Sequence, residues 1–433
     1  MNGVNEVYYT RCVIALAETI PVTTSQAIFS VTGIKLVNPG VRLNSTFFDR
    51  FAQQNLLPPL EQCLQVQGGV DHAALLQLAS EMLQQDGALQ RAASTLPDVA
   101  AWLHPLSKIN LCEPVVFLLT LAREQRPALL QHSVLVALLS IYLGMRMGMS
   151  LQHLTLLASA GLFHDLGELR IDERLFAGQH KPGPGQRRML RTHPAISQHI
   201  LLNTAAYPLE LLQAVAQHHE RMDGSGYPFG MAGSEMNRYG RILSIAEAVA
   251  NKLDERQSAS ALEFMLKLNS HQFDEHLLRI MLGLFGHSSP PRVQRAPTLQ
   301  AASVPRLHEE IGKFGLAINY WQRLLDVTPP PRGPAAFIQQ RLGKLAFVTR
   351  AAGINPADKL SLTAGIEHDA DSLAEVEQLS NEVLQQVREI MFEVQRRWPD
   401  FAADNSPVGE VVRGWMEHMG ELLLTAEERV LPE

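Results

Sequence analysis

Histidines are unevenly distributed, since half of the 16 lie between residues 132 and 219, about one fifth of the chain. Two doublets stand out in this segment: His164 precedes Asp165, and His218 precedes His219. Adjacent residues on a helix point about 100° apart, so a doublet does not belong to one apolar stripe. A carboxylate can bridge two cations while imidazole nitrogens bind at terminal positions. The doublets therefore predict a site for two neighbouring metal ions.

Further donors of the same type flank the doublets: His132, His193 and Glu247. Neutral imidazoles with carboxylates suit iron, manganese or zinc, and the lack of nearby cysteine argues against a structural zinc site. A single histidine is more often a core or surface residue than a ligand. Three further histidines, His153, His180 and His199, are therefore interpreted as core or surface residues.

The surrounding sequence predicts the helices that must position these side chains. From Ala73 to about Gly286, apolar residues recur at spacings of three and four, as in LELLQAVAQHH, which indicates a helical bundle. Within it, the apolar run Val134 to Met145 is too short to span a membrane and is interpreted as a buried core helix.

The flanking segments differ from this bundle. Residues 1–70 mix short alternating runs, such as VYYTRCVIAL, with turn-rich pieces, which predicts a small β-containing element. Residues 71–287 form the predicted helical domain, and the Pro-, Ser- and Ala-rich residues 288–305 form a linker. Residues 306–433 are predicted as a C-terminal helical region, which is acidic: residues 361–433 carry 16 acidic side chains against five arginines.

Composition limits the class of function. The net charge of -7 gives no support for a groove that binds a nucleic-acid polymer or for a basic membrane-binding face. The three cysteines are widely separated, which indicates a reducing compartment. The first residues lack the pattern of a secretory leader, so a cytoplasmic location is expected.

Three motifs together resemble the HD-GYP family of HD-superfamily phosphohydrolases: HD at 164–165, THP at 192–194 and HHERMDGSGYP at 218–228. The resemblance covers roughly residues 100 to 290. It implies a mainly all-α fold, with an HD-type helical bundle between the small N-terminal element and the C-terminal helices. It also implies metal-dependent hydrolysis of cyclic di-GMP to the linear dinucleotide or to GMP.

The resemblance implies roles for individual residues. The implied metal ligands are His132, His164, Asp165, His193, His218, His219 and Glu247, the last in place of the family's aspartate. Two divalent ions are expected, iron or manganese, because Ala128 occupies the position of the additional glutamate of trinuclear members. A hydroxide that bridges the two ions would attack the phosphodiester in line, so no protein nucleophile is needed.

The other expected site residues lie near the ligands. Asp165, Glu168 and Arg221 are assigned to catalysis, and substrate contacts are assigned to Arg221, Gly226, Tyr227, Pro228 and Arg256. Gly224 and Gly226 allow the positive φ angles and close approach that such a loop needs. Arg221 has two equal interpretations, either a bidentate contact to a phosphate or guanine edge, or a solvated loop residue.

Three positions depart from the family pattern. Glu168 replaces a lysine that approaches the substrate phosphate, Glu247 is one methylene longer than the usual aspartate, and Asn251 replaces a second acid. A carboxylate repels a phosphodiester in a poorly solvated site. Three alternatives follow for Glu168. Its side chain points away from the substrate phosphate, it binds a metal ion or supports a metal ligand, or its charge weakens activity.

These departures leave three hypotheses for function. The first is a phosphodiesterase for cyclic di-GMP, the second is a metal-stabilised receptor or signalling scaffold without turnover, and the third is a phosphohydrolase of another nucleotide. Expected partners are the cyclic dinucleotide and a GGDEF-type or other signalling protein, with no nucleic-acid polymer and no membrane. The acidic C-terminal helices are compatible with a homodimer, a partner-binding surface or a solvated tail.

Overall fold

The computed structural model describes residues 3–175, 184–254, 259–285, 317, 321, 333–351 and 370–423. Helices make up most of this structure, and the named strands among the described residues are short and precede residue 67. The predicted mainly-α fold class is therefore confirmed. By Cα proximity the chain divides into two compact units, Met1–Arg256 with His271–Leu284, and Gln257–Ser270 with Phe285–Glu433. The predicted linker, residues 288–305, lies outside the described residues, so the domain boundaries stay predictions.

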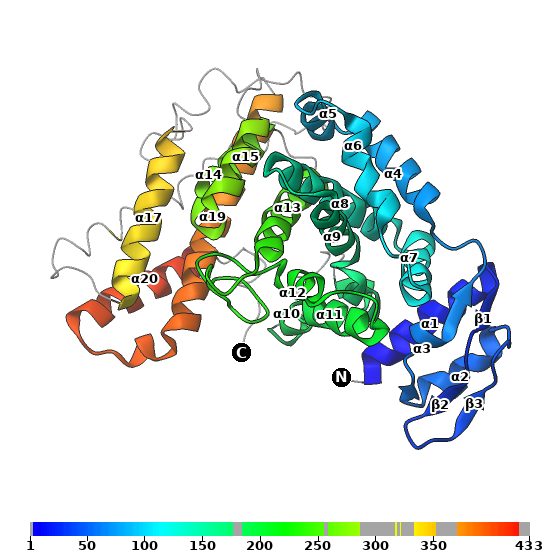
Figure 1. Cartoon of the computed structure of the whole chain (residues 1–433). Helices are drawn as coiled ribbons and strands as arrows, with labels where there is room; N and C mark the ends of the chain where they lie inside the picture. The colour runs from blue at the N-terminus through cyan, green and yellow to red at the C-terminus, as the bar shows by residue number, and fades with distance from the viewer. Residues whose placement is uncertain are drawn as a thin grey trace. The chain divides into compact units, whose positions relative to one another are not determined.

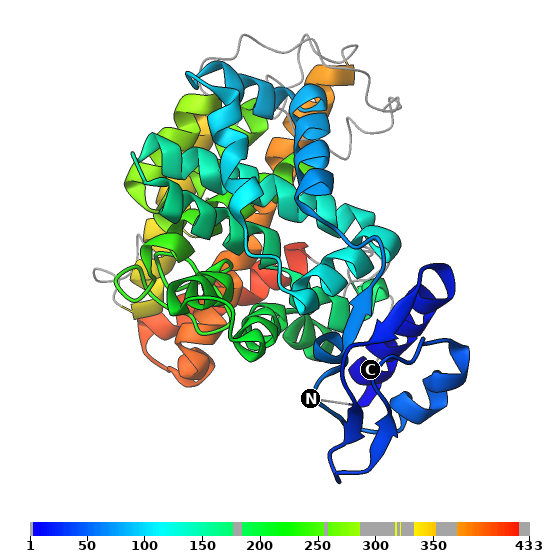
Figure 2. The same ribbon diagram turned by 45° about the vertical axis from the view of Figure 1, so that its right-hand side comes forward.

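The N-terminal element contains the predicted strands. β1 (Val22–Thr24) pairs antiparallel with β5 (Leu64–Val66), and β2 (Ile28–Ser30) lies between β3 (Lys35–Val37) and β4 (Leu56–Leu57). Figure 2 shows these strands beside the helix that opens the chain. The remaining elements are η1 (Ser45–Phe47), α2 (Phe48–Ala52) and α3 (Leu60–Cys63).

One part of this element was predicted wrongly. The run VYYTRCVIAL at residues 7–16 lies inside a helix, α1 (Gly3–Thr19), and not in a strand. The buried side chains Tyr9, Val13 and Leu16 recur at spacings of four and three, which is the period of a helix face. A short apolar run fits both the strand period and the helix period. Packing of the buried face selected the helix.

Helices that surround the histidines form the middle of the first unit (Figure 1). They are α7 (Glu113–Gln125), α8 (Pro127–Arg146), α9 (Leu151–Phe163), α11 (His193–Thr204), α12 (Leu209–Gln217) and α13 (Arg238–Asp254). A second layer is formed by α4 (His72–Gln85), α5 (Gly87–Ser94), α6 (Val99–Leu103) and η2 (His104–Lys108). Short elements complete the unit: η3 (Leu166–Arg170), η4 (Glu173–Leu175), α10 (Pro184–Leu190), η5 (Ser270–Gln272) and α15 (Glu275–Phe285).

The α8–α9 contact is close because a glycine lies in it. A Cβ added at Gly161 would lie 2.6 Å from Ala137 Cα and 2.7 Å from Ala137 N. No side chain fits between the two backbones at this point. The contact therefore fixes the end of α9, where His164 lies, against α8, which carries His132.

The segment that follows Asp165 is attached to the N-terminal element through Arg170. Its guanidinium donates to Glu6 at 2.8 Å and to both oxygens of Glu61 at 2.7 Å. It also lies over the ring of Tyr9, 4.4 Å from the centroid. Buried charges require such partners, so this network holds η3 in place.

The second unit has its own apolar core. Its helices are α14 (Ala259–Leu268), α17 (Gly333–Ala351), α19 (Ala370–Arg397), η6 (Pro399–Ala403) and α20 (Pro407–Leu423). The rings of Trp321 and Trp415 meet edge to face with centroids 5.9 Å apart, within a buried cluster that includes Leu342, Val387 and Val412. The described part of residues 306–433 is thus helical, as the sequence predicts for this region.

The helix that contains the apolar run Val134 to Met145 is longer than the run itself. It lies within α8, which is long and apolar enough to cross a membrane by length and composition, and 78% of its most apolar window is buried inside the fold. Burial of that kind is typical of a core helix.

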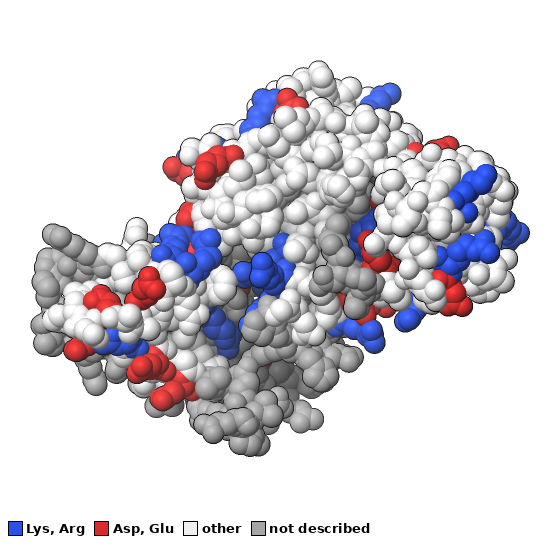
Figure 3. Space-filling view, turned by 90° about the horizontal axis from the view of Figure 1, so that it is seen from below, with Lys and Arg blue, Asp and Glu red and all other residues white. Residues whose placement is uncertain are grey.

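On the face shown in Figure 3, basic and acidic side chains are interspersed over the described surface.

We expect Gly161→Ala to destabilise the protein by about 1–3 kcal/mol, because the added methyl group would overlap the backbone of α8. Gly283→Ala is the matched control, since a Cβ at this helical glycine would meet nothing within 4 Å. The control should change stability by about 1 kcal/mol or less, in the stabilising direction. Denaturant unfolding of both variants measures the difference, and equal stability would contradict the close contact.

Candidate metal centre

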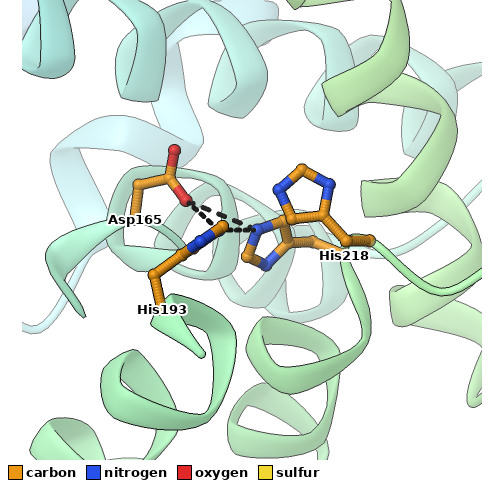
Figure 4. Close-up of side chains that lie close together, drawn as sticks. Asp165, His193 and His218 are labelled. Carbon is orange, nitrogen blue, oxygen red and sulfur yellow. Dashed lines mark hydrogen bonds and ion pairs between the residues drawn. The ribbon is translucent and has the colours of Figure 1, made fainter. Parts of the chain in front are cut away.

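The fold brings all seven predicted ligands together from five segments of the chain. They form two groups in which the ligand atoms lie within 4.8 Å of one another: Asp165, His193, His218 and His219, and His132, His164, Asp165 and Glu247. Asp165 belongs to both groups. Figure 4 shows its carboxylate directed toward the rings of His193 and His218. This sharing is the arrangement that a bridging carboxylate requires.

Backbone carbonyls orient three of the imidazoles. The Nδ1 atoms of His164, His193 and His218 each lie 2.7 Å from the carbonyl oxygen three residues earlier. A carbonyl only accepts hydrogen bonds, so Nδ1 carries the proton and Nε2 is the atom left to act as ligand. This assignment follows from the hydrogen-bond partners.

The inward atoms are closely spaced. Nε2 of His193 lies 3.1 Å from Nε2 of His218, and these atoms lie 3.2 and 3.4 Å from Asp165 Oδ1. Two imidazole lone pairs at this distance repel each other unless a proton or a cation lies between them. The first group therefore fits a cation held by His193, His218 and Asp165.

The second group contains buried atoms without a well-directed hydrogen bond. Nε2 of His164 lies 3.0 Å from Asp165 Oδ2 and 3.1 Å from Glu247 Oε2. Neither this nitrogen nor Asp165 Oδ1, the oxygen that faces the first group, makes a hydrogen bond of acceptable geometry. Native proteins rarely leave buried polar atoms unsatisfied. The donor set, imidazoles with carboxylates, fits a divalent transition metal.

Two residues of α13 support this group. Nδ1 of His132 lies 2.6 Å from Asp254 Oδ2, while its Nε2 lies 2.9 Å from Glu247 Oε2. Asn251 donates to the other oxygen of Glu247 at 2.7 Å. Such outer partners fix the ring and the tautomer of a metal-binding histidine. Asp254 was missed, although Glu247, Asn251 and Asp254 have the i, i+4, i+7 spacing of one helix face.

The buried charges shift the pKa values of the group. Burial lowers the pKa of His164, but Asp165 and Glu247 raise it more, to about 10. Burial by itself would raise the pKa of Asp165, while His164 and His193 hold it well below its usual range. Burial lowers the pKa of His218 to about 4. Without metal, the carboxylates therefore keep protons on some imidazoles and not on others.

Glu168 lies in the cavity wall but outside both groups of ligand atoms. Its Oε2 accepts a hydrogen bond from Arg126 Nη2 at 2.7 Å, and its carbonyl accepts from Arg126 Nη1 at 2.9 Å. Burial, followed by the charge of Asp165, raises the pKa of Glu168 to about 7, although Arg126 lowers it. The alternatives for the role of Glu168 therefore stay predictions, and Arg126 is a neighbour that the sequence interpretation missed.

The glycine-rich turn is braced by Glu220. Its carboxylate accepts from the backbone N–H groups of Phe229 at 2.7 Å and Met231 at 2.9 Å. Gly224 has a φ of +74°, and a Cβ at Gly226 would lie 2.4 Å from Glu220 Cα. Both glycines are therefore required by the turn.

Tyr227 is the residue of this turn that faces the ligands. Its ring stacks on His219 with centroids 4.5 Å apart, and the guanidinium of Arg191 lies 5.3 Å from the centroid of Tyr227. Pro228 follows through a cis peptide bond and does not line the cavity described below. Substrate contacts by Gly226, Tyr227 and Pro228 stay predictions.

Arg221 has several partners in and around the turn. Its Nη1 donates to the carbonyls of His218 and Glu220 and, at 2.8 Å, to Ser244 Oγ, while the guanidinium lies over the ring of Phe273. Those acceptors hold Arg221 within the packed turn, and its expected roles in substrate binding and catalysis stay predictions. Arg256 lies outside the described residues.

A cavity of about 570 Å³ opens onto the ligands. Its described wall carries five carboxylates, three imidazoles, one guanidinium and one phenol, from Asp165, Glu168, Glu173, Glu247, Asp254, His132, His193, His219, Arg126 and Tyr227. A volume of this size accepts a nucleotide-sized ligand. The metal groups lie at the wall of this cavity, where a bound ligand could reach them.

Comparison with known proteins identifies the class. Residues 116–277 match the HD domain family. A cyclic di-GMP phosphodiesterase of Pseudomonas aeruginosa is 27% identical over 52% of this chain and 55% of its own length. A cyclic di-GMP phosphodiesterase of Thermotoga maritima is 34% identical over 27% of this chain and 32% of its own. A 3'3'-cGAMP-specific phosphodiesterase of Vibrio cholerae is 32% identical over 27% of each chain.

Residues 116–277 thus form an HD domain. Together with the HHERMDGSGYP motif, these matches support the assignment of this domain to the HD-GYP family. It spans between about a quarter and about half of the length of these relatives. A solved HDG"Y"P protein from Bdellovibrio bacteriovorus aligns with a TM-score of 0.36 and 14% identity, over 61% of this chain and 95% of that one.

Substitution of Asp165 should remove more metal than substitution of any single histidine, because Asp165 belongs to both groups. We expect Asp165→Asn to lose both ions and His218→Ala to lose one. His199→Ala is the control, since this ring contacts Asn203 outside the groups. Elemental analysis of purified protein measures the content. Two ions retained by Asp165→Asn would contradict a shared ligand.

Metal binding should release protons. The pKa of His164 is raised from 6.5 to about 10, so its imidazolium stabilises the metal-free fold fully below pH 6.5, and this contribution is lost as pH rises toward 10. A metal ion must displace that proton, so metal affinity should increase with pH across this window. Calorimetry of Mn²⁺ binding at pH 7 in buffers of different ionisation enthalpy measures the release, and a heat independent of the buffer would contradict it.

Proposed function

We propose that this chain is a metal-dependent phosphodiesterase that hydrolyses cyclic di-GMP to the linear dinucleotide or to GMP. The observation that carries the proposal is the pair of ligand groups that share Asp165 beside an accessible cavity. The printed activities of the relatives from P. aeruginosa and T. maritima support the same substrate. Because the chain spans only part of those relatives, the activity is inferred from the site.

The fit of the residues supports two divalent ions, with iron or manganese preferred for this donor set. His193, His218, His219 and Asp165 would hold one ion, and His132, His164, Glu247 and Asp165 the other. When bound, such a pair lowers the pKa of water and withdraws charge from a phosphodiester. No nucleophile from the chain is then required.

The residues of this chain would orient the reaction. Asp254 and Asn251 hold His132 and Glu247 at their positions, and the carbonyl contacts keep the Nε2 atoms of three imidazoles directed inward. Tyr227, stacked on His219, forms a flat wall against which a nucleotide base can lie.

Another cyclic dinucleotide is the second candidate substrate. The V. cholerae relative with 32% identity is named a 3'3'-cGAMP-specific phosphodiesterase, which supports a cyclic dinucleotide of this kind as an alternative substrate. A receptor without turnover is the third candidate, motivated by Glu168 in the cavity wall. The expected signalling partner, the homodimer and the cytoplasmic location stay predictions.

Protein reconstituted with manganese or iron should hydrolyse cyclic di-GMP, and the double variant His164→Ala, Asp165→Ala should lose roughly a hundredfold or more of that activity. A metal pair contributes several kcal/mol to the transition state, which corresponds to at least this factor. Product analysis by chromatography with cyclic di-GMP and 3'3'-cGAMP measures both rates. His199→Ala is the control, with wild-type rate and metal content.

Two outcomes would contradict the proposal. Protein that holds two ions and binds cyclic di-GMP in calorimetry without turnover would be a receptor. Faster turnover of 3'3'-cGAMP than of cyclic di-GMP would retain the reaction class and replace the substrate.

A further inference from the structure

An ion pair forms part of the cavity wall beside the metal centre. Arg126 precedes α8, and Glu168 lies in η3, the segment that follows Asp165. Both side chains are 13% exposed, and Nη2 of Arg126 lies 2.7 Å from Glu168 Oε2. Arg126 also donates to the carbonyl of Glu168 at 2.9 Å. Two contacts to one residue hold the guanidinium at the cavity.

The charge balance of the wall makes this arginine distinctive. Asp165 and Glu247 belong to the groups of metal ligands. Three further carboxylates line the cavity, those of Glu168, Glu173 and Asp254. Among the described lining residues, Arg126 is the one arginine and there is no lysine. Those carboxylates repel a phosphate. Within the described part of the wall, Arg126 is therefore the cation available to a phosphate away from the metal ions.

We propose that Arg126 anchors the second phosphate of a cyclic dinucleotide, and that Glu168 occupies the guanidinium until this phosphate arrives. The inference rests on the proposed function, since it names the residue that selects a two-phosphate substrate at the same site. A guanidinium binds a carboxylate and a phosphate with the same planar fork of N–H donors. The substrate phosphate and Glu168 therefore compete for Arg126.

This competition makes the pair a determinant of specificity. A diester with a single phosphate, bound at the metal ions, leaves the Arg126–Glu168 pair intact and gains nothing from it. A cyclic dinucleotide replaces the carboxylate of Glu168 by its second phosphate. Removal of the Glu168 charge should therefore strengthen the binding of a cyclic dinucleotide, and removal of Arg126 should weaken it.

Steady-state kinetics of the manganese-loaded full chain test this proposal with two substrates, cyclic di-GMP and bis(p-nitrophenyl) phosphate. Arg126→Gln should raise KM for cyclic di-GMP about tenfold or more relative to its effect on the small diester. Glu168→Gln should lower KM for cyclic di-GMP. Glu173→Gln is the matched control, because it removes the same charge from the same wall, and its effect should be smaller than that of Glu168→Gln.

Metal content and thermal unfolding of each variant separate a binding effect from misfolding. If Arg126→Gln does not fold, the comparison of Glu168→Gln with Glu173→Gln decides, because weaker repulsion of the substrate would lower KM to a similar extent in both variants. Equal increases of KM for both substrates in Arg126→Gln, or a higher KM for cyclic di-GMP in Glu168→Gln, would overturn the proposal.

A protein without turnover can still be tested. Calorimetry then compares the affinity of the manganese-loaded chain for cyclic di-GMP and for GMP. A tenfold loss of cyclic di-GMP affinity in Arg126→Gln, with a smaller loss for GMP, supports the role of Arg126 even though catalysis has failed. Equal losses for both nucleotides overturn it.

Discussion

The shared position of Asp165 is the constraint on which the site depends. One buried carboxylate lies among imidazoles from four segments of the chain and contributes an oxygen to each group of ligand atoms. Negative charge in such a place is costly unless cations or protons compensate it. The low pKa of Asp165 and the raised pKa of His164 are the response of the metal-free chain to this cost. A pair of metal ions would take over the same compensation.

The rest of the fold holds Asp165 and its neighbours still. Gly161 lets α9 approach α8 at the point where α9 delivers His164. Arg170, five residues after Asp165, is bound by Glu6 and Glu61 of the N-terminal element. The N-terminal element thus contacts the segment that carries Asp165 and Glu168, so a disturbance of that element would reach the metal-binding segment through Arg170.

Much of this organisation could be predicted from the sequence, because helical periodicity and adjacent donors are local features. The doublets at His164 and His218 and the helices that carry them needed no long-range information. The partners of Glu168 and Arg221 could not be predicted, since they depend on which way a side chain turns after the chain has folded. Arg126 lies 42 residues from Glu168, and no spacing rule relates them. The strand prediction for residues 7–16 was wrong for a different reason, because a short apolar run satisfies both the strand and the helix period.

The central claim is that one carboxylate joins two cations, and crystals of the manganese-loaded chain test it most directly by anomalous diffraction. The account predicts two anomalous peaks roughly 3.5 to 4 Å apart, with Asp165 bound to both. One peak, or two peaks that do not share Asp165, would contradict it.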